Sequence, residues 1–513
     1  MSQKKHLVIN FIAQVLFSVI NLGISFFLVP HIIESLNATA YGFINLSNDF
    51  VNYASLITVA LNSIAGRYIT IAIHKKQKEE ANIYYNSVII ANIIMSVIIF
   101  IPLMIFTLFI DKFLEVPVNI LSDVKILFIV VFINFVLSLI TSVFTIATFT
   151  TNKLYLNSIA SIASQVSRCI ILLILYSCFK SNVWYVGFAS LISTIIVSGA
   201  NYVFTKKLMP ELYFDYKLFN INYVWELLKN GVWNSVNKLS GILQTGLDLL
   251  LSNIFVGAAA MGIISLPRTI NSIIFSLFGS IASIFNPNIM QAYAKDDYDS
   301  IKRQLNFSMK FVALFSNLCI AVFIVLGINF YNLWVPTQNI KFLYFLSIIA
   351  LPALAIGLPL EPVYCVHTSA NKIKQPALVT LLLSCITIAL VFIGVNLFTN
   401  ENIKIIIISG TSSILSLLRL CFYIPVYTAK ILNEKKTYLY PTMFRNLLSL
   451  IICIIIGFLI KPLLFYNNWI MFFISCAILS IIYLLINFII NFNKNEKTQF
   501  IEFFKKQFKI KRV

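Results

Sequence analysis

Residues 38–46 read ATAYGFINL, and residues 258–266 read AAAMGIISL. The two stretches align without gaps when the chain is shifted by 220 residues. The match continues further on, where Ser63-Ile64, Ile69, Ala72 and Lys75 recur as Ser283-Ile284, Ile289, Ala292 and Lys295. Near a shift of 219 residues, Asn152-Lys153 recurs as Asn371-Lys372. We interpret these matches as an internal repeat.

The composition is that of a protein embedded in lipid. The chain has 513 residues, of which 59% are hydrophobic and 11% are charged, and its mean hydropathy is +0.89. Soluble domains carry about a quarter charged residues. So few charges cannot cover a chain of this length with a water-facing surface. We therefore expect an all-α polytopic membrane protein.

The apolar runs predict about fourteen transmembrane helices, because about 20 apolar residues cross the hydrocarbon layer. Polar breaks separate the runs at approximately 7–29, 40–72, 84–110, 124–148, 154–178, 183–204, 232–256, 262–290, 306–330, 341–366, 376–398, 403–427, 444–465 and 468–491.

The net charge of +19 follows membrane topology rather than a nucleic-acid surface. Most Lys and Arg residues fall at the two termini and in alternate loops, which the positive-inside rule places in the cytoplasm. The loops on the outer side carry only Lys112, Lys125, Lys180, Lys341, Lys404 and Lys461. We therefore expect a multi-pass protein of a bacterial cytoplasmic membrane with both termini cytoplasmic, and no nucleic-acid partner.

The repeat predicts the domain organisation. Its length pairs odd spans with odd spans, so both copies cross the membrane in the same direction, as in transporters built from two halves with the site between them. We expect an N-lobe of six spans, an amphipathic linker on the inner surface, a C-lobe of six spans, two further spans and a basic cytoplasmic tail, at residues 1–209, 210–231, 232–430, 431–491 and 492–513.

Polar residues form stripes on several spans. In span seven they follow at steps of three or four, which places them on one helix face: Asn234, Lys238, Gly241, Thr245, Asp248 and Ser252. The aligned positions of span one include Gln14 and Asn21, and span two carries Asn48 and Asn52. Close helix packing through small and polar residues is the alternative interpretation of such stripes.

Charged residues inside the spans favour a functional role, because each costs at least about 2.5 kcal/mol at mid-membrane. The candidate substrate-binding cations are Arg67, Lys238, Arg268 and Arg168, with Gln14, Asn21, Asn48, Asn52, Asn234 and Asp248 as candidate polar lining. Arg and Lys suit phosphate oxygens. An Asp248–Arg268 ion pair of purely structural value is an alternative for those two residues.

Two six-helix repeats, the A-x-x-Y/M-G motif after the first helix of each half and two extra C-terminal helices resemble the polysaccharide flippases. These belong to the multidrug/oligosaccharidyl-lipid/polysaccharide (MOP) exporter superfamily. The resemblance implies a MATE-like fold and alternating access for an undecaprenyl-pyrophosphate-linked oligosaccharide. It also implies that Arg67, Lys238, Arg268 and Arg168 engage pyrophosphate. Span one carries no cation in its stripe, which favours an O-antigen, capsule or teichoic-type glycan over the peptidoglycan precursor.

Other function classes have less support in the sequence. A multidrug or cation antiporter of the same superfamily is the main alternative, and a polytopic glycan polymerase or ligase is a further one. The sequence contains no P-loop and no HExxH motif. We therefore expect a transporter rather than an enzyme, without a cofactor or metal, and with sodium or protons as candidate coupling ions. The expected partners are the lipid-linked oligosaccharide, membrane lipids and a glycan polymerase, and we expect a monomer.

Overall fold

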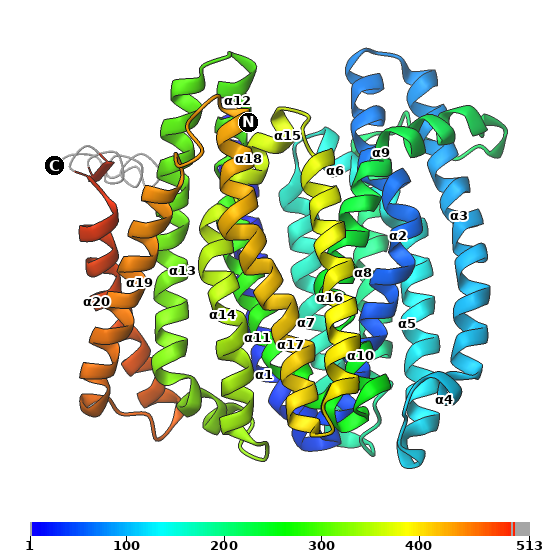
Figure 1. Ribbon diagram of the computed structural model, residues 1–513. Helices are drawn as coiled ribbons and strands as arrows, with labels where there is room; N and C mark the ends of the chain where they lie inside the picture. Colours follow the sequence, from blue (N-terminus) through cyan, green and yellow to red (C-terminus); the bar gives the residue numbers. More distant parts are fainter. Residues whose placement is uncertain (1–2, 494–495, 498–513) are drawn as a thin grey trace. The chain divides into compact units, whose positions relative to one another are not determined.

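The computed structural model of the chain describes residues 3–493 and 496–497, and these residues form helices and connecting turns with no strand (Figure 1). Twelve of the described helices are long and apolar enough to cross a membrane. The expected all-α polytopic class is therefore confirmed. The first and seventh expected spans also form helices, but the count of fourteen stays a prediction. Most of the expected basic tail, 492–513, lies outside the described residues.

The chain divides into two compact units. The first comprises residues 1–265 and 377–405, and the second comprises residues 266–376 and 406–513. Neither unit coincides with one repeat, because the first unit contains span seven and the second contains the last two spans. The division into lobes 1–209 and 232–430 stays a prediction.

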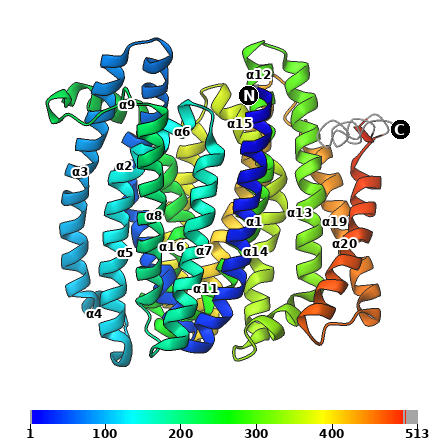
Figure 2. The ribbon, with the colours of Figure 1, turned by 180° about the vertical axis from the view of Figure 1, so that it is seen from behind.

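The first unit consists mainly of long helices joined by short turns. Their order is α1 (Gln3–Leu36), α2 (Ala38–His74), α3 (Lys78–Leu108), α4 (Ile110–Phe113), η1 (Val118–Ile120), α5 (Leu121–Thr141), η2 (Ser142–Thr145), α6 (Ile146–Thr150), α7 (Leu154–Cys178), α8 (Tyr185–Leu208), η3 (Tyr216–Leu218), α9 (Ile221–Gly241), η4 (Ile242–Gly246) and α10 (Asp248–Phe255). Most of α16 (Lys374–Leu397) and the start of α11 (Ala258–Ser283) also belong to it. Figure 2 shows α1 beside α7, with which it is in contact.

The packing of α9 along α2 brings two expected spans into direct contact. At the crossing, Gly231 lies so close to the backbone of Ala60 that a Cβ atom would overlap the carbonyl group of Ala60. Glycine allows this approach because it has no side chain. The result is that polar side chains of both helices come within hydrogen-bonding distance.

The segment before α9 is held by α3. The side chain of Asn86 donates to the carbonyl oxygen of Tyr213 at 3.0 Å and accepts from the backbone amide of Asp215 at 2.8 Å. The segment expected as a surface linker, 210–231, is therefore not one element, since its last eleven residues form the first turns of α9. Asn220 explains this start, because its side chain caps the helix through the amide of Asn222.

The second unit holds the C-terminal spans. Its helices are the remainder of α11, then α12 (Asn286–Ala294), α13 (Tyr298–Trp334), α14 (Ile340–Leu360), α15 (Val363–Ser369), α17 (Glu401–Leu418), η5 (Arg419–Tyr423), α18 (Ile424–Ile431), α19 (Tyr440–Ile460), η6 (Lys461–Leu463) and α20 (Trp469–Asn491). In both ribbon views α19 and α20 lie beside α13 (Figures 1 and 2). The two extra spans are therefore packed on span nine.

The backbone repeats the same turns in both copies. Asn37 and Gly257 lie 220 residues apart and have φ angles of 79° and 126°, and Lys76 and Asp296, again 220 apart, have φ angles of 62° and 54°. Asn152 and Asn371 have φ angles of 55° and 53°. Left-handed residues are uncommon outside glycine. Their recurrence in register supports the internal repeat seen in the sequence.

The repeated motifs also touch each other within the first unit. A Cβ atom at Gly42 would lie 3.1 Å from the Cα atom of Gly262, and one at Gly262 would lie 2.6 Å from the carbonyl oxygen of Ala38. The absence of a side chain at the glycine of each motif thus allows the backbone of the other motif to approach closely. This contact explains why both copies of the motif carry glycine at the same place.

Candidate functional site

Polar side chains of α2 and α9 meet along a line that we call the polar seam. It consists of Asn52, Ser63 and Tyr68 on α2 and Asn230, Asn234 and Lys238 on α9. The Nζ atom of Lys238 donates to Oδ1 of Asn52 at 3.1 Å, and Nδ2 of Asn234 donates to Oγ of Ser63 at 2.9 Å. Nδ2 of Asn230 donates to the Tyr68 hydroxyl at 3.0 Å. Since residue numbers rise along α9 as those of their partners fall, the two helices are antiparallel.

The charge in this seam is accessible. Asn52 is exposed and Lys238 is half-buried. Arg67 is also exposed and lies one helical turn beyond Ser63, on the same face of α2. Two of the four predicted cations therefore lie along one polar face, where they could hold an anion.

A π-helical turn interrupts span seven next to the seam. Residues Ile242–Gly246 form η4, and Asp248 begins α10 just beyond it. The hydroxyl of Tyr53 on α2 donates to the carbonyl oxygen of Gly246 at 2.5 Å. Single π-turns occur frequently at functional sites. No residue pattern in the sequence indicates this turn or the partner Tyr53.

Arg168 lies apart from the seam on α7. Its side chain is half-buried, and its Nε atom is buried without a hydrogen-bond partner among the described residues. A buried polar atom of this kind requires an explanation, such as a water or an ion. The role of Arg168 as an anion ligand therefore stays a prediction, and Arg168 is not part of the seam that contains Lys238.

Arg268 belongs to α11 in the second unit, where it is half-buried and follows Pro267 directly. The substrate-binding role of Arg268 stays a prediction. The alternative Asp248–Arg268 ion pair also stays a prediction. Arg419 begins the π-helix η5 in the same unit. Each unit thus contains a π-turn close to a basic residue, namely η4 after Lys238 and η5 at Arg419.

The remaining predicted polar residues have more local surroundings. Oε1 of Gln14 accepts from the hydroxyl of Ser158 on α7 at 3.2 Å, so it joins α1 to α7. Asn21 is half-buried on α1. Asn48 is exposed and donates to the carbonyl oxygen of Ile44 in its own helix at 2.9 Å. Of the predicted lining, only Asn52 and Asn234 are brought to the seam with Lys238.

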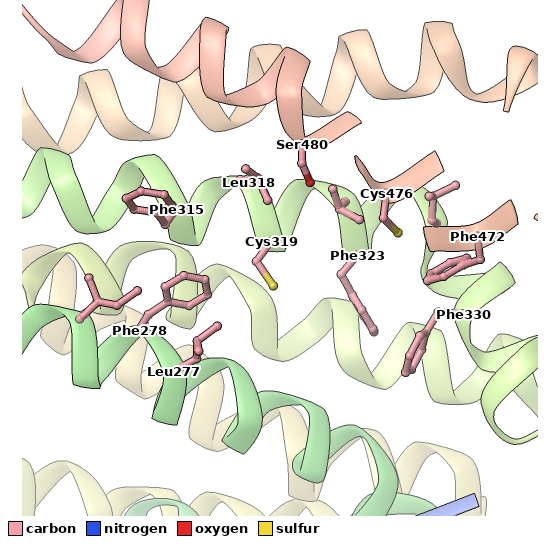
Figure 3. A pocket seen from close by; sticks show the side chains of 13 residues that line it. Leu277, Phe278, Phe315, Leu318, Cys319, Phe323, Phe330, Phe472, Cys476 and Ser480 are labelled. Atoms are coloured by element: carbon pink, nitrogen blue, oxygen red, sulfur yellow. The ribbon is translucent and has the colours of Figure 1, made fainter. Parts of the chain in front are cut away.

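An apolar pocket of about 440 Å³ lies in the second unit (Figure 3). Side chains of α11, α13 and α20 line it, among them Phe278, Phe323 and Phe472. Ser480 supplies one of its few polar atoms. The lining suits a hydrocarbon chain, and part of it comes from one of the two extra C-terminal spans.

The sequence matches the family described as "Polysaccharide biosynthesis protein" over residues 7–292. It is also 30% identical over 432 residues to the uncharacterized membrane protein EpsK of Bacillus subtilis (strain 168), covering 83% of this chain and 84% of EpsK. The chain belongs to the polysaccharide biosynthesis protein family. The matched residues include the whole polar seam.

Solved structures share the fold at low sequence identity. The lipid II flippase MurJ, in an inward closed conformation, superposes with a TM-score of 0.65 at 15% identity, covering 93% of this chain and 97% of MurJ. An inward-facing MATE multidrug transporter of the MOP superfamily gives a TM-score of 0.65 at 14% identity, covering 81% of this chain and 95% of the transporter. The expected MATE-like fold is therefore confirmed.

Proposed function

We propose that the protein is a flippase that moves an undecaprenyl-pyrophosphate-linked oligosaccharide from the inner to the outer leaflet of a bacterial cytoplasmic membrane. Family membership in polysaccharide biosynthesis and the shared fold of MurJ and MATE transporters support a transporter rather than an enzyme. The observation that carries the proposal is the Lys238–Asn52 contact in a polar seam between two spans. A cation beside amide groups can hold both a phosphate and a sugar hydroxyl.

The proposed mechanism is alternating access, in which the seam is open to one side of the membrane at a time. Lys238 and Arg67 would attract the pyrophosphate, while Asn52 and Asn234 would bind sugar hydroxyls. The apolar pocket of the second unit is by itself suited to a hydrocarbon chain such as an isoprenoid, because hydrocarbon transfers from lipid to such a lining without loss of hydrogen bonds. Sodium or protons remain the candidate coupling ions.

The proposal is tested in a deletion strain complemented with the wild-type or the variant gene. Lipid-linked glycan should accumulate on the inner leaflet of the deletion strain and reach the surface again when the wild-type gene is supplied. If the deletion leaves surface glycan intact but increases sensitivity to cationic drugs, the antiporter alternative replaces the flippase. A glycan that is flipped but remains unpolymerised would instead favour the polymerase alternative.

A further inference from the structure

A second basic site lies outside the polar seam, at one end of the second unit. A pocket of about 310 Å³ opens between the turn that follows α15 and the last turn of α18. Its lining consists of Asn371, Lys372, Lys374, Gln375, Tyr427, Lys430 and Ile431. A volume of this size is at the lower end of the range for ligand sites. The pocket could therefore hold a compact polar group.

The charge of this pocket is positive. Three of its seven lining residues are lysines, and none of the described residues that line it is acidic. The acid that follows α18 is already engaged, because Oε1 of Glu434 accepts from Nζ of Lys302 at 2.8 Å. Three lysines around one hollow favour an anion, and lysine is a common ligand of phosphate.

The framework of the pocket is fixed by buried contacts. The hydroxyl of Tyr427 donates to the carbonyl oxygen of Lys372 at 3.1 Å, which ties the turn to α18. At the next residue of α18, the hydroxyl oxygen of Thr428 lies 2.8 Å from Nε2 of the buried His367 on α15. Because both walls are tied together, the lysines project from a preformed support rather than from a free loop.

The first repeat fills the corresponding turn differently. There, Nδ2 of Asn10 donates to the carbonyl oxygen of Asn152 at 3.0 Å, and its Oδ1 accepts from the backbone amide of Tyr155 at 2.9 Å. A neutral side chain from α1 thus occupies the turn that matches Asn371-Lys372. The lysine-lined pocket is a feature of the second copy, which the repeat itself does not explain.

We propose that this pocket binds the phosphate group of an anionic ligand, and that the headgroup of an inner-leaflet phospholipid is its source. The expected topology places this end of the unit in the cytoplasm, where anionic lipids attract basic segments. The same lysines would also bind the phosphate group of a soluble compound. The site is separate from the polar seam and does not depend on which substrate the protein carries.

The test uses the full-length protein in micelles that contain equal amounts of phosphatidylglycerol and phosphatidylcholine, with bound lipid measured by native mass spectrometry. The wild type should retain phosphatidylglycerol preferentially. Each lysine near an anionic headgroup contributes a factor of about five in affinity. The double variant Lys372→Ala/Lys430→Ala should therefore lose roughly 25-fold in retention, whereas Lys372→Arg/Lys430→Arg should keep most of it.

The matched control is Lys435→Ala/Lys436→Ala, which removes two exposed lysines from the loop that follows α18 in the same unit. It should bind phosphatidylglycerol like the wild type, and all variants should share one unfolding midpoint. Inorganic phosphate and pyrophosphate form the second arm. One outcome is that these ions raise the unfolding midpoint of the wild type but not that of Lys372→Ala/Lys430→Ala, while the protein retains phosphatidylglycerol and phosphatidylcholine equally. In that case the source is a soluble phosphate compound. If neither ligand depends on these lysines, or if the control loses as much, the phosphate site is refuted.

Discussion

The ammonium group of Lys238 on α9 donates a hydrogen bond of 3.1 Å to the side-chain oxygen of Asn52 on α2. Asn52 lies in a helix apolar enough to cross a membrane, and Lys238 lies in the expected seventh span. A charge there needs either a buried counter-charge or access to water and polar groups. Here the Lys238 ammonium group bonds to a neutral amide rather than to a carboxylate, so this contact supplies no negative charge that would compete with an anionic ligand. The proposed transport activity follows from this relationship.

Removing the charge of Lys238 should impair transport without unfolding the protein. A hydrogen bond to a charged group contributes about 1.5–3 kcal/mol, so Lys238→Ala should reduce glycan export roughly ten- to hundredfold. Lys238→Arg should be milder than Lys238→Glu. Export is measured as surface glycan in the complemented deletion strain. Lys229→Ala, on an exposed lysine of the same helix, is the control and should export normally. Equal export by the Ala, Arg and Glu variants would leave Lys238 only a packing role.

Replacing Gly231 by alanine should destabilise the contact between α2 and α9. The new Cβ atom would overlap the carbonyl group of Ala60, and such overpacking costs about 1–3 kcal/mol. The unfolding midpoint in detergent should fall. Gly199→Ala on α8 is the control, because a Cβ atom there meets nothing within 4 Å. A midpoint unchanged by Gly231→Ala would mean that the two helices are not packed as described.

A polar network should anchor the two extra spans. Oδ1 of Asn487 on α20 accepts from Oγ of Ser449 on α19 at 2.8 Å and from Nδ2 of Asn317 on α13 at 3.2 Å. Each such bond between membrane helices contributes about 0.6 kcal/mol. Asn487→Leu should therefore lower the free energy of unfolding by about 1 kcal/mol or more. Asn396→Leu, at an exposed residue that bonds within its own helix, should have little effect. Equal losses in both variants would contradict the anchoring role.

A salt bridge should secure the start of the C-terminal tail. The Nζ atom of Lys310, whose side chain is only 6% exposed, lies 2.6 Å from Oε1 of Glu496. Removing one partner of a buried pair costs about 3–5 kcal/mol, because the other charge stays buried alone. Glu496→Gln should therefore lower the unfolding midpoint in a thermal melt. Glu79→Gln, at an exposed glutamate, is the control. If the Lys310→Met/Glu496→Gln double variant is no more stable than Glu496→Gln alone, the pair has no such role.

Helical periodicity predicted which residues share a helix face, but it did not predict that the faces of α2 and α9 meet in the seam. Asn234 and Lys238 are four residues apart, and Asn52 belongs to a similar stripe on span two. The same rule is insufficient for Asn62, a further polar residue of span two. Its Nδ2 atom donates to Oδ1 of Asn92 on α3 at 2.9 Å, in the interior of the first unit. A helix of 37 residues contacts several neighbours, and periodicity does not say which neighbour each residue faces.

Other features had no signal in the sequence. The π-turn at Ile242–Gly246 depends on backbone hydrogen bonds that no residue pattern specifies. The basic pocket is formed by lysines whose places in the sequence indicate only the inner membrane face. Lys372 and Lys430 are far apart in the chain and meet only because α15 and α18 pack together. The repeat, by contrast, is visible in the sequence because the close contact between Gly42 and Gly262 requires glycine in both copies.

The most direct test of the central claim measures whether water reaches the polar seam in the membrane. In a variant whose eight native cysteines are replaced, Lys238→Cys is treated in membrane vesicles with a charged, water-soluble thiol reagent. Ile98→Cys, at an exposed apolar residue of α3, is the comparison. We predict rapid modification of Lys238→Cys, slow modification of Ile98→Cys, and protection of the former by a lipid-linked pyrophosphate saccharide. If both cysteines react equally slowly, the seam faces lipid, and a cation-lined transport path through it is excluded.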